Sequence, residues 1–205
     1  MRRQKQAKIK VGIIGEHPNN DALALLHLLR LVASEHVEFV VMQKNNRGSQ
    51  LDSMKFFRTL RAEFKAENPQ HIIILRDLDG LLAETGKVVR LDQWFEKANK
   101  EIQNCGIFYL AIYEMEALIL SDIDNFNQYF NLKTKPIGDP LFIEKPKEFL
   151  QKLTEKTKKG KYSENDAPKI FQSLSFFNIY KYHKGKRSFQ CFADDLEIKG
   201  LISVG

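Results

Sequence analysis

Short apolar runs alternate with longer segments of helical periodicity along the first two thirds of this chain. The runs lie at residues 9–15, 37–42, 72–75 and 107–112, and apolar residues recur at helical spacing in 22–32, 53–67, 93–103 and 116–130. Strands that alternate with helices form βαβ units with right-handed crossovers, which build a mainly parallel sheet. The sequence therefore predicts an α/β fold with a mainly parallel, Rossmann-like sheet flanked by helices. We expect polar loops at 17–20 and 80–87, with Asn20 or Asp21 capping the helix after the first.

The alternation stops after residue 132, which divides the chain into three parts. Residues 1–8 form a basic tail and residues 9–132 carry the α/β pattern. Pro136, Gly138 and Pro140 then make a turn-rich link, and helices are expected at 145–156, at 167–177 and near 191–196. We expect residues 133–205 to form a small helix-rich C-terminal extension that packs on the sheet.

Two aspartates follow the third apolar run directly, in the stretch HIIILRDLDG at residues 71–80. In open parallel sheets, ligands bind beyond the carboxyl ends of the strands. Asp77 and Asp79 held close together would repel each other unless a cation lies between them, and a hard divalent cation such as Mg²⁺ suits carboxylate oxygens. The alternative is an ordinary turn, because Asp-Gly is common in turns.

Acidic residues also follow two other expected strands. They are Glu16 after the first strand, and Glu114 and Glu116 after the fourth. Because the carboxyl ends of parallel strands share one edge, we expect these three glutamates to lie near Asp77 and Asp79. Such a cluster favours a site for Mg²⁺ or Mn²⁺ that could polarise a phosphate, with a glutamate as general acid or base.

The composition favours a polyanionic partner. The chain of 205 residues has 32 Lys and Arg against 26 Asp and Glu, a formal net charge of +6, which is suited to DNA or RNA. Cys105 and Cys191 form neither a metal-binding pair nor a disulfide framework, which fits a reducing cytosol. No apolar run approaches the length of a membrane span or of a signal peptide. We therefore expect a cytoplasmic protein with no membrane partner.

The order of the acids resembles the TOPRIM domain of topoisomerases, primases and the OLD (overcoming lysogenisation defect) nucleases, in which a Glu follows the first strand and D-x-D follows the third. The stretch YEMEALILSD, residues 113–122, is similar to a segment of a TOPRIM-like family often encoded beside bacterial ATPases. The resemblance covers residues 8–130, and it extends more weakly to KKGKYSENDAPKIFQSL and RSFQCFADDL in the C-terminal extension.

This resemblance implies a Mg²⁺-dependent (or Mn²⁺-dependent) nuclease that hydrolyses phosphodiester bonds of DNA or RNA. It also implies a defence or mobile-element system with an ATPase partner. Glu16 would act as the acid/base or as a metal ligand, and Asp77 and Asp79 would hold metal. Glu114 and Glu116 would add ligands or orient them.

The sequence departs from the TOPRIM pattern directly after Glu16. TOPRIM-like nucleases commonly have Gly at the next position and an acid shortly beyond, whereas here His17 follows and Asp21 comes later, in a longer loop. The role of Asp21 is therefore open. His17 could touch a metal or a phosphate, or be a solvated loop residue. The alternative function is a catalytically inactive TOPRIM-like protein that binds nucleic acid or an ATPase.

The stretch IIILRDLDGLL also resembles the nucleophile motif of haloacid-dehalogenase (HAD)-like phosphatases, in which the first Asp attacks phosphate and the second is the acid/base. Leu81 stands where that family usually has Thr. The motif also tends to open that fold, whereas here it follows two complete βα units. A phosphatase is thus a further alternative.

Basic residues gather in the C-terminal extension. The candidates for contact with nucleic-acid phosphates are Lys156, Lys158, Lys159, Lys161 and Arg187. Such contacts would be independent of sequence and sensitive to salt, whereas a solvated helix face is the alternative for the lysine run. Arg76, directly before Asp77, could bind a phosphate or balance the acids.

Overall fold

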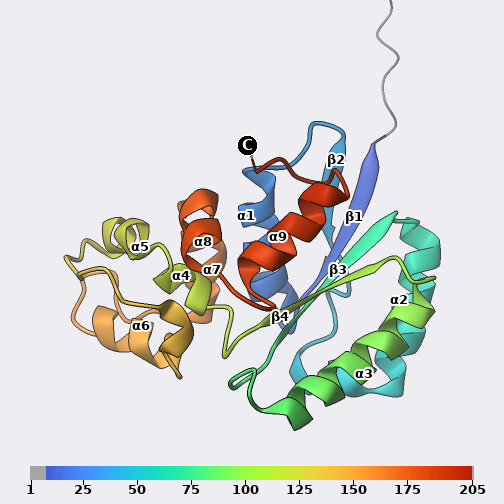
Figure 1. Cartoon of the computed structure of the whole chain (residues 1–205), viewed down its shortest axis with the longest axis horizontal. Helices are drawn as coiled ribbons and strands as arrows, with labels where there is room; N and C mark the ends of the chain where they lie inside the picture. Colours follow the sequence, from blue (N-terminus) through green and yellow to red (C-terminus); the bar gives the residue numbers. More distant parts are fainter. Residues whose placement is uncertain (1–7, 205) are drawn as a thin grey trace, which may run out of the picture.

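Four parallel strands form the centre of the structure, a computed structural model that describes residues 8–204 (Figure 1). The strands are β1 (Ile9–Ile14), β2 (Val37–Val41), β3 (His71–Asp77) and β4 (Gly106–Ala111), and their order in the sheet is β2-β1-β3-β4. The prediction of an α/β fold with a parallel sheet flanked by helices is confirmed. Most of the expected basic tail, residues 1–7, lies outside the described residues.

Strand β3 is buried on both faces of the sheet. Ile73 and Leu75 belong to one apolar core, whereas Ile72 and Ile74 belong to a second core on the opposite face. Successive side chains of a strand point to opposite faces, so a strand with helices on both sides has to be apolar at every position. This is why the run before Asp77 is continuous rather than alternating.

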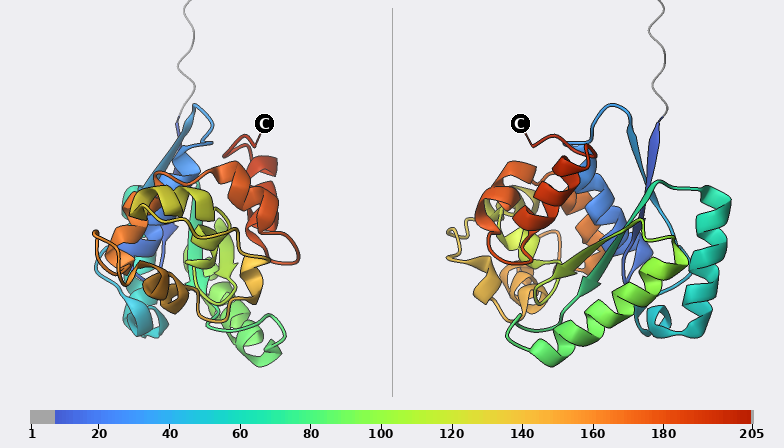
Figure 2. Two further views of the ribbon diagram at one scale, coloured as in Figure 1. Left: turned by 90° about the vertical axis from the view of Figure 1, so that its left-hand side faces the viewer. Right: turned by 45° about the vertical axis from the view of Figure 1, so that its right-hand side comes forward.

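Helices cover both faces of the sheet (Figure 2). The second core packs α2 (Met54–Glu67) and α3 (Thr85–Glu101) on one face. The first core packs α1 (Leu23–Arg30), α7 (Ala167–Phe171), α8 (Phe176–Tyr182) and α9 (Phe189–Ile198) on the other. The remaining helices are α4 (Ala117–Leu120), α5 (Ile123–Phe130) and α6 (Pro146–Thr154).

The C-terminal extension shares its core with the sheet. Phe189 and Phe192 of α9 lie with their ring centres 5.9 and 4.7 Å from the ring centre of Tyr109 in β4. After α9, the amide of Ser203 donates to the carbonyl of Val32, which ties the end of the described chain to the segment that follows α1. The expected boundary after residue 132 therefore does not separate two apolar cores.

Helix α3 begins at Thr85, eight residues before the expected start near residue 93. Gly86 and the polar residues around it resemble a loop in the sequence, so the first two turns of the helix were missed. In the structure, the carboxylate of Glu84 accepts the amide of Leu81 at 3.0 Å and pairs with Lys87 at 2.9 Å, which stabilises the start of the helix.

Two segments that were each expected to be one helix are interrupted. The segment 116–130 divides into α4 and α5 at Asp122, and the segment 167–177 breaks between α7 and α8. The carboxylate of Asp122, only 2 % exposed, accepts the amide of Ser175 at 2.6 Å and the side chain of Asn178 at 2.8 Å. The two interruptions are therefore linked by contacts between residues more than fifty positions apart. The spacing of apolar residues in each segment does not predict these contacts.

Gly15 allows a π-helical turn, Pro18–Ala22, to approach the end of β1. Because this turn begins at Pro18, Asn20 and Asp21 do not cap α1 as expected. A Cβ atom at Gly15 would lie 2.8 Å from the amide nitrogen of Ala22, which belongs to the backbone and cannot rotate away. Gly15 thus sets how closely the segment containing Asp21 lies against the sheet.

Among residues 8–204, the structure contains no helix with the length and apolarity needed to cross a membrane.

We expect Gly15→Ala to lower the free energy of unfolding by roughly 1–3 kcal/mol, because the added methyl group forces the backbone apart. Gly138→Ala is the matched control, since a Cβ at Gly138 meets no atom within 4 Å. Urea unfolding of both variants measures the difference. Equal stability of the two variants would contradict the close approach at Gly15.

Candidate functional site

The candidate acids lie where the order of strands in the sheet reverses. Strand β1 is followed by β2 on one side, and the chain then crosses back to form β3 on the other side of β1. Ligands of open parallel sheets bind at such a switch point, beyond the carboxyl ends of the strands. Glu16 lies two residues after β1 and Asp77 is the last residue of β3, so the structure places both at this point.

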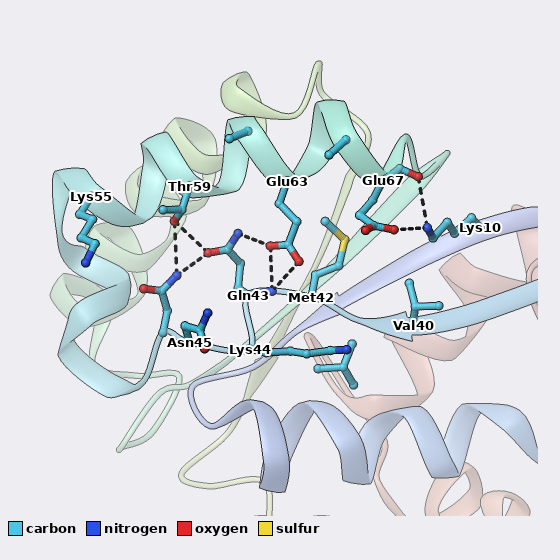
Figure 3. Close-up of a pocket in the computed structure, with 14 residues that line it drawn as sticks. Lys10, Val40, Met42, Gln43, Lys44, Asn45, Lys55, Thr59, Glu63 and Glu67 are labelled. Carbon is cyan, nitrogen blue, oxygen red and sulfur yellow. Dashed lines mark hydrogen bonds and ion pairs between the residues drawn. The ribbon is translucent and has the colours of Figure 1, made fainter.

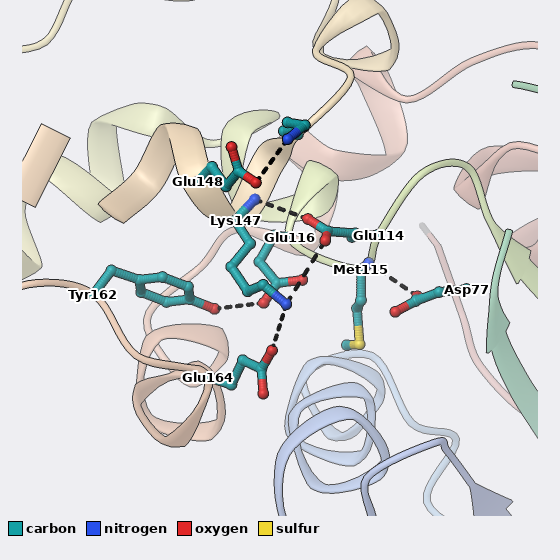
Figure 4. A network of polar contacts seen from close by, with 9 residues as sticks. Asp77, Glu114, Met115, Glu116, Lys147, Glu148, Tyr162 and Glu164 are labelled. Atoms are coloured by element: carbon teal, nitrogen blue, oxygen red, sulfur yellow. Dashed lines mark hydrogen bonds and ion pairs between the residues drawn. The ribbon is translucent and has the colours of Figure 1, made fainter. Parts of the chain in front are cut away.

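Asp77 is the centre of the acidic cluster. Its Oδ1 accepts the amide of Met115 at 3.1 Å, which holds the carboxylate against the segment that follows β4 (Figure 4). Burial at the sheet edge raises the pKa of Asp77 well above its ordinary value, and neighbouring negative charges raise it further. In decreasing order of effect, these neighbours are Asp21, Glu116, Glu16 and Asp79.

Asp21, whose role the sequence left open, belongs to this cluster. Its Oδ2 accepts the amide of His17 at 2.8 Å, so the longer loop closes on itself and brings the acid back to the sheet edge. Burial raises the pKa of Asp21 to about 7, against the opposing effect of the His17 hydrogen bond. The charges of Glu116 and Glu16 add to the increase. The imidazole Nδ1 of His17 is buried and has no hydrogen-bond partner among residues 8–204.

Glu114 and Glu116 are held by the C-terminal extension (Figure 4). The carboxylate of Glu114 accepts the amide of Lys147 at 2.9 Å and lies 3.7 Å from its ammonium group, which also pairs with Glu164 at 2.7 Å. Glu116 accepts the hydroxyl of Tyr162 at 3.0 Å. Burial, followed by the charge of Glu114, raises the pKa of Glu116 to about 7.

Arg76 balances the acids on the other side of the cluster. Its Nε donates to Glu16 at 2.6 Å and a second guanidinium nitrogen donates to Asp52 at 3.1 Å. The guanidinium carbon lies 4.7 Å from the ring centre of Trp94, and Arg76 is only 7 % exposed. Of the two roles considered for Arg76, the structure shows the pairing with acids.

Asp79 differs from Asp77 in its backbone and its exposure. Its φ angle is +51°, in the left-handed region, so the two aspartates do not form an extended D-x-D pair. The amide of Asp79 donates to the carbonyl of Tyr113, and its own carbonyl accepts the ammonium of Lys87, both at 2.9 Å. Its side chain is exposed at the edge of the cluster.

The carboxylates of the acidic cluster are the ligands that Mg²⁺ prefers, but their side chains do not converge on one point. Among residues 8–204, no three His, Cys, Asp or Glu side chains lie close enough together to hold a metal ion. One cause is that Glu16 is turned to Arg76 and Glu114 to Lys147. Mg²⁺ usually binds one or two carboxylates and keeps several waters, so Asp77 and Asp21 with their mutual repulsion still fit this ion.

A cavity of about 770 Å³ opens beside the cluster, on the face covered by α2 and α3. Glu16, Asp77 and Asp79 line one part of it. Three basic residues of α3 line another part; they are Lys87, Arg90 and Lys97. These cations were not among the predicted site residues, because the stretch containing the first two was expected to be a loop or the segment before a helix.

The basic residues singled out from the sequence lie elsewhere. Lys156, Lys158 and Lys161 are exposed on the loop after α6, and the ammonium of Lys159 lies 3.8 Å from the ring centre of Tyr129. Arg187 forms two hydrogen bonds, of 2.8 and 2.7 Å, with the carboxylate of Asp92. None of these five residues lines the cavity beside Asp77.

A second cavity, of about 790 Å³, lies between β2 and α2 (Figure 3). Its polar groups pair with one another: Glu63 accepts the backbone amide of Gln43 at 3.0 Å, and Lys10 pairs with Glu67. It contains none of the candidate acids.

Comparison of the chain with protein-family models, with curated proteins and with solved structures finds no match. Membership of the TOPRIM family therefore stays a prediction that rests on the motifs.

The raised pKa of Asp21 makes stability depend on pH in one direction. Below about pH 4, Asp21 is protonated in both the folded and the unfolded protein and does not change the free energy of unfolding. As the pH rises from about 4 to about 7, the free energy of unfolding falls, because the folded protein resists the ionisation of Asp21. We expect Asp21→Asn to raise the free energy of unfolding, relative to the wild type, by roughly 2–4 kcal/mol at pH 8 and by almost nothing at pH 4. Urea unfolding of both proteins at several pH values measures this difference.

His183 also makes stability depend on pH, but its effect is the same in the wild type and in Asp21→Asn and cancels in their difference. This buried imidazole accepts the amide of Phe189 at 2.9 Å, and burial lowers its pKa to about 4, so both proteins lose stability as the pH falls from about 6.5. Asp124→Asn, at an exposed acid of α5, is the control and should change stability by less than about 0.5 kcal/mol at every pH. If the increase in the free energy of unfolding caused by Asp21→Asn became smaller as the pH rises, Asp21 would not be buried among like charges.

Proposed function

We propose that this protein is a TOPRIM-like, Mg²⁺-dependent nuclease that hydrolyses phosphodiester bonds of DNA or RNA. The observation that carries the proposal is that acids following three parallel strands lie at one edge of the sheet, close enough to Asp77 for their charges to raise its pKa, at the switch point of the sheet. Their like charges oppose one another, and a divalent cation would relieve this repulsion. The motif resemblance supplies the reaction class, together with the cytoplasmic, defence-related setting and the ATPase partner.

Within this proposal, Asp77 and Asp21 hold Mg²⁺ (or Mn²⁺), and Glu116 supports them from the end of β4. The bound ion supplies Lewis-acid stabilisation of the charge on the phosphate. Glu16 accepts a proton from the attacking water, and Arg76 positions its carboxylate beside the cavity. Lys147 and Tyr162 keep Glu114 and Glu116 in place. Asp79, exposed at the cavity, is a further ligand candidate.

We expect Asp77→Asn and Glu16→Gln each to lower the cleavage rate by at least about 100-fold, because the first removes a metal ligand and the second the proton acceptor. The measurement is cleavage of a labelled oligonucleotide, as DNA and as RNA, with Mg²⁺ or Mn²⁺. Asp124→Asn is the control for loss of a carboxylate away from the cluster. Cleavage that persists undiminished in both site variants would show that this mechanism is wrong.

Binding of Mg²⁺ should also raise the stability of the folded protein. At a concentration of one hundred times its dissociation constant, a ligand that binds only the folded state adds about 2.7 kcal/mol. We expect Mg²⁺ at pH 8 to raise the melting temperature of the wild type, and to raise that of Asp77→Asn much less. Asp77→Asn should itself be the more stable protein without metal, because it removes a charge from the cluster. Equal responses of the two proteins to Mg²⁺ would place the metal elsewhere.

A second candidate function is a non-catalytic TOPRIM-like protein that binds nucleic acid or an ATPase. The ion pair between Glu16 and Arg76 favours it, because this pair engages the proposed proton acceptor. The two functions differ in the metal titration, since the non-catalytic protein needs no Mg²⁺ at Asp77. Turnover of a chromogenic phosphomonoester that depends on Asp77 would instead favour a phosphatase.

A further inference from the structure

We propose that the cavity beside Asp77 binds an unpaired nucleic-acid strand, with its phosphates along α3 and a base against the exposed side chain of Met54. The proposal deepens the proposed function and rests on it, because it names the form of the substrate at the same site. It assigns the binding role to α3 rather than to the lysines after α6.

The basic residues of α3 form a row that leads away from the acids. Lys87, Arg90 and Lys97 are three and seven residues apart, which places them along one side of the helix over about 15 Å. Lys87 lies nearest the acids, since its ammonium contacts the carbonyl of Asp79 at 2.9 Å. Arg90 and Lys97 are exposed.

Two further charged residues line the cavity, Arg76 and Asp52, and they pair with each other, while Arg76 also pairs with Glu16. The remaining charges lie on two sides. Glu16, Asp77 and Asp79 lie at the edge of the sheet, whereas the row of cations lies on the helix. A strand whose reacting phosphate lies at the acids, with a divalent cation, would place its neighbouring phosphates along the row. Charge complementarity therefore gives the bound strand both a position and a direction.

The cavity also has an apolar part, which a phosphate backbone does not require. Met54, at the start of α2, is 70 % exposed, and Phe57 and Leu91 line the cavity beside it. The indole nitrogen of Trp94 donates to the carbonyl of Leu51 at 3.1 Å, so this ring holds the wall in place. A duplex keeps its bases stacked inside, whereas an unpaired strand can place a base on such a surface.

The test measures binding without cleavage. A labelled strand of about 12 nucleotides, alone or paired with its complement, is titrated with the full chain in buffer containing EDTA, and fluorescence anisotropy reports binding. The variants are Arg90→Glu with Lys97→Glu, and Met54→Ala. Lys156→Glu with Lys158→Glu is the control that makes the same change of charge outside the cavity. Thermal unfolding checks that each variant is folded, as expected for exposed positions.

We expect the unpaired strand to bind more tightly than its duplex. The α3 double variant should weaken binding of the strand at least 10-fold, and should reduce the slope of log affinity against log salt by about 1.4 for two lost phosphate contacts. Met54→Ala should weaken binding of the unpaired strand by about 5–10-fold and leave the duplex unchanged, in line with a lost base contact. The control pair should change binding less than 3-fold.

Three results would overturn the proposal: tighter binding of the duplex, unchanged binding by the α3 double variant, or an equal loss from the control pair. These outcomes can be distinguished from a failure of the proposed nuclease function. A strand that binds along α3 without any cleavage dependent on Asp77 refutes the proposed function alone, whereas cleavage dependent on Asp77 with unchanged binding by the α3 variant refutes this inference alone.

Discussion

A strand that is buried on both faces can carry charge only at its ends, and this constraint organises the protein around Asp77. Residues 72–75 lie between two apolar cores, so the first charged side chains after them, Arg76 and Asp77, come at the edge of the sheet. The neighbouring strands meet the same requirement, and their acids arrive at the same edge. Low exposure and like charges then raise the pKa of Asp77, so that this edge of the sheet favours a proton or, as we propose, a divalent cation.

The cluster is held together by two cations that come from different parts of the chain. Arg76 belongs to the central strand and engages Glu16, whereas Lys147 belongs to the C-terminal extension and engages Glu114. Tyr162, also from the extension, donates to Glu116. The extension therefore completes the site, in addition to covering the sheet with α7, α8 and α9. Its removal would expose apolar residues of the sheet and free the glutamates after β4.

Elements with a local sequence signal were predicted, whereas those that depend on distant contacts were not. The strands and α2 were predicted closely, because the strands are apolar runs and because Phe56, Leu60 and Phe64 recur at helical spacing. The structure adds a cap, since the hydroxyl of Ser53 accepts the amide of Phe56. The start of α3 was not predicted, since Gly86 disfavours a helix locally and the pairing of Glu84 with Lys87 compensates. The break at Asp122 was not predictable either, because its partners lie in α8. With α3 misplaced, its row of cations could not be recognised as one face.

The sequence by itself determined the parallel α/β fold and the edge at which Glu16, Asp77, Asp79, Glu114 and Glu116 lie, because apolar runs and helical spacing are local signals and their alternation implies a parallel sheet. Only the tertiary structure decided which of these acids interact. It brought Asp21 close enough to Asp77 to raise the pKa of Asp77, turned Glu16 to Arg76, and placed Lys147 and Tyr162 against the two glutamates. These contacts join residues far apart in the chain, and their pattern follows from how the helices pack, which residue spacing alone does not encode.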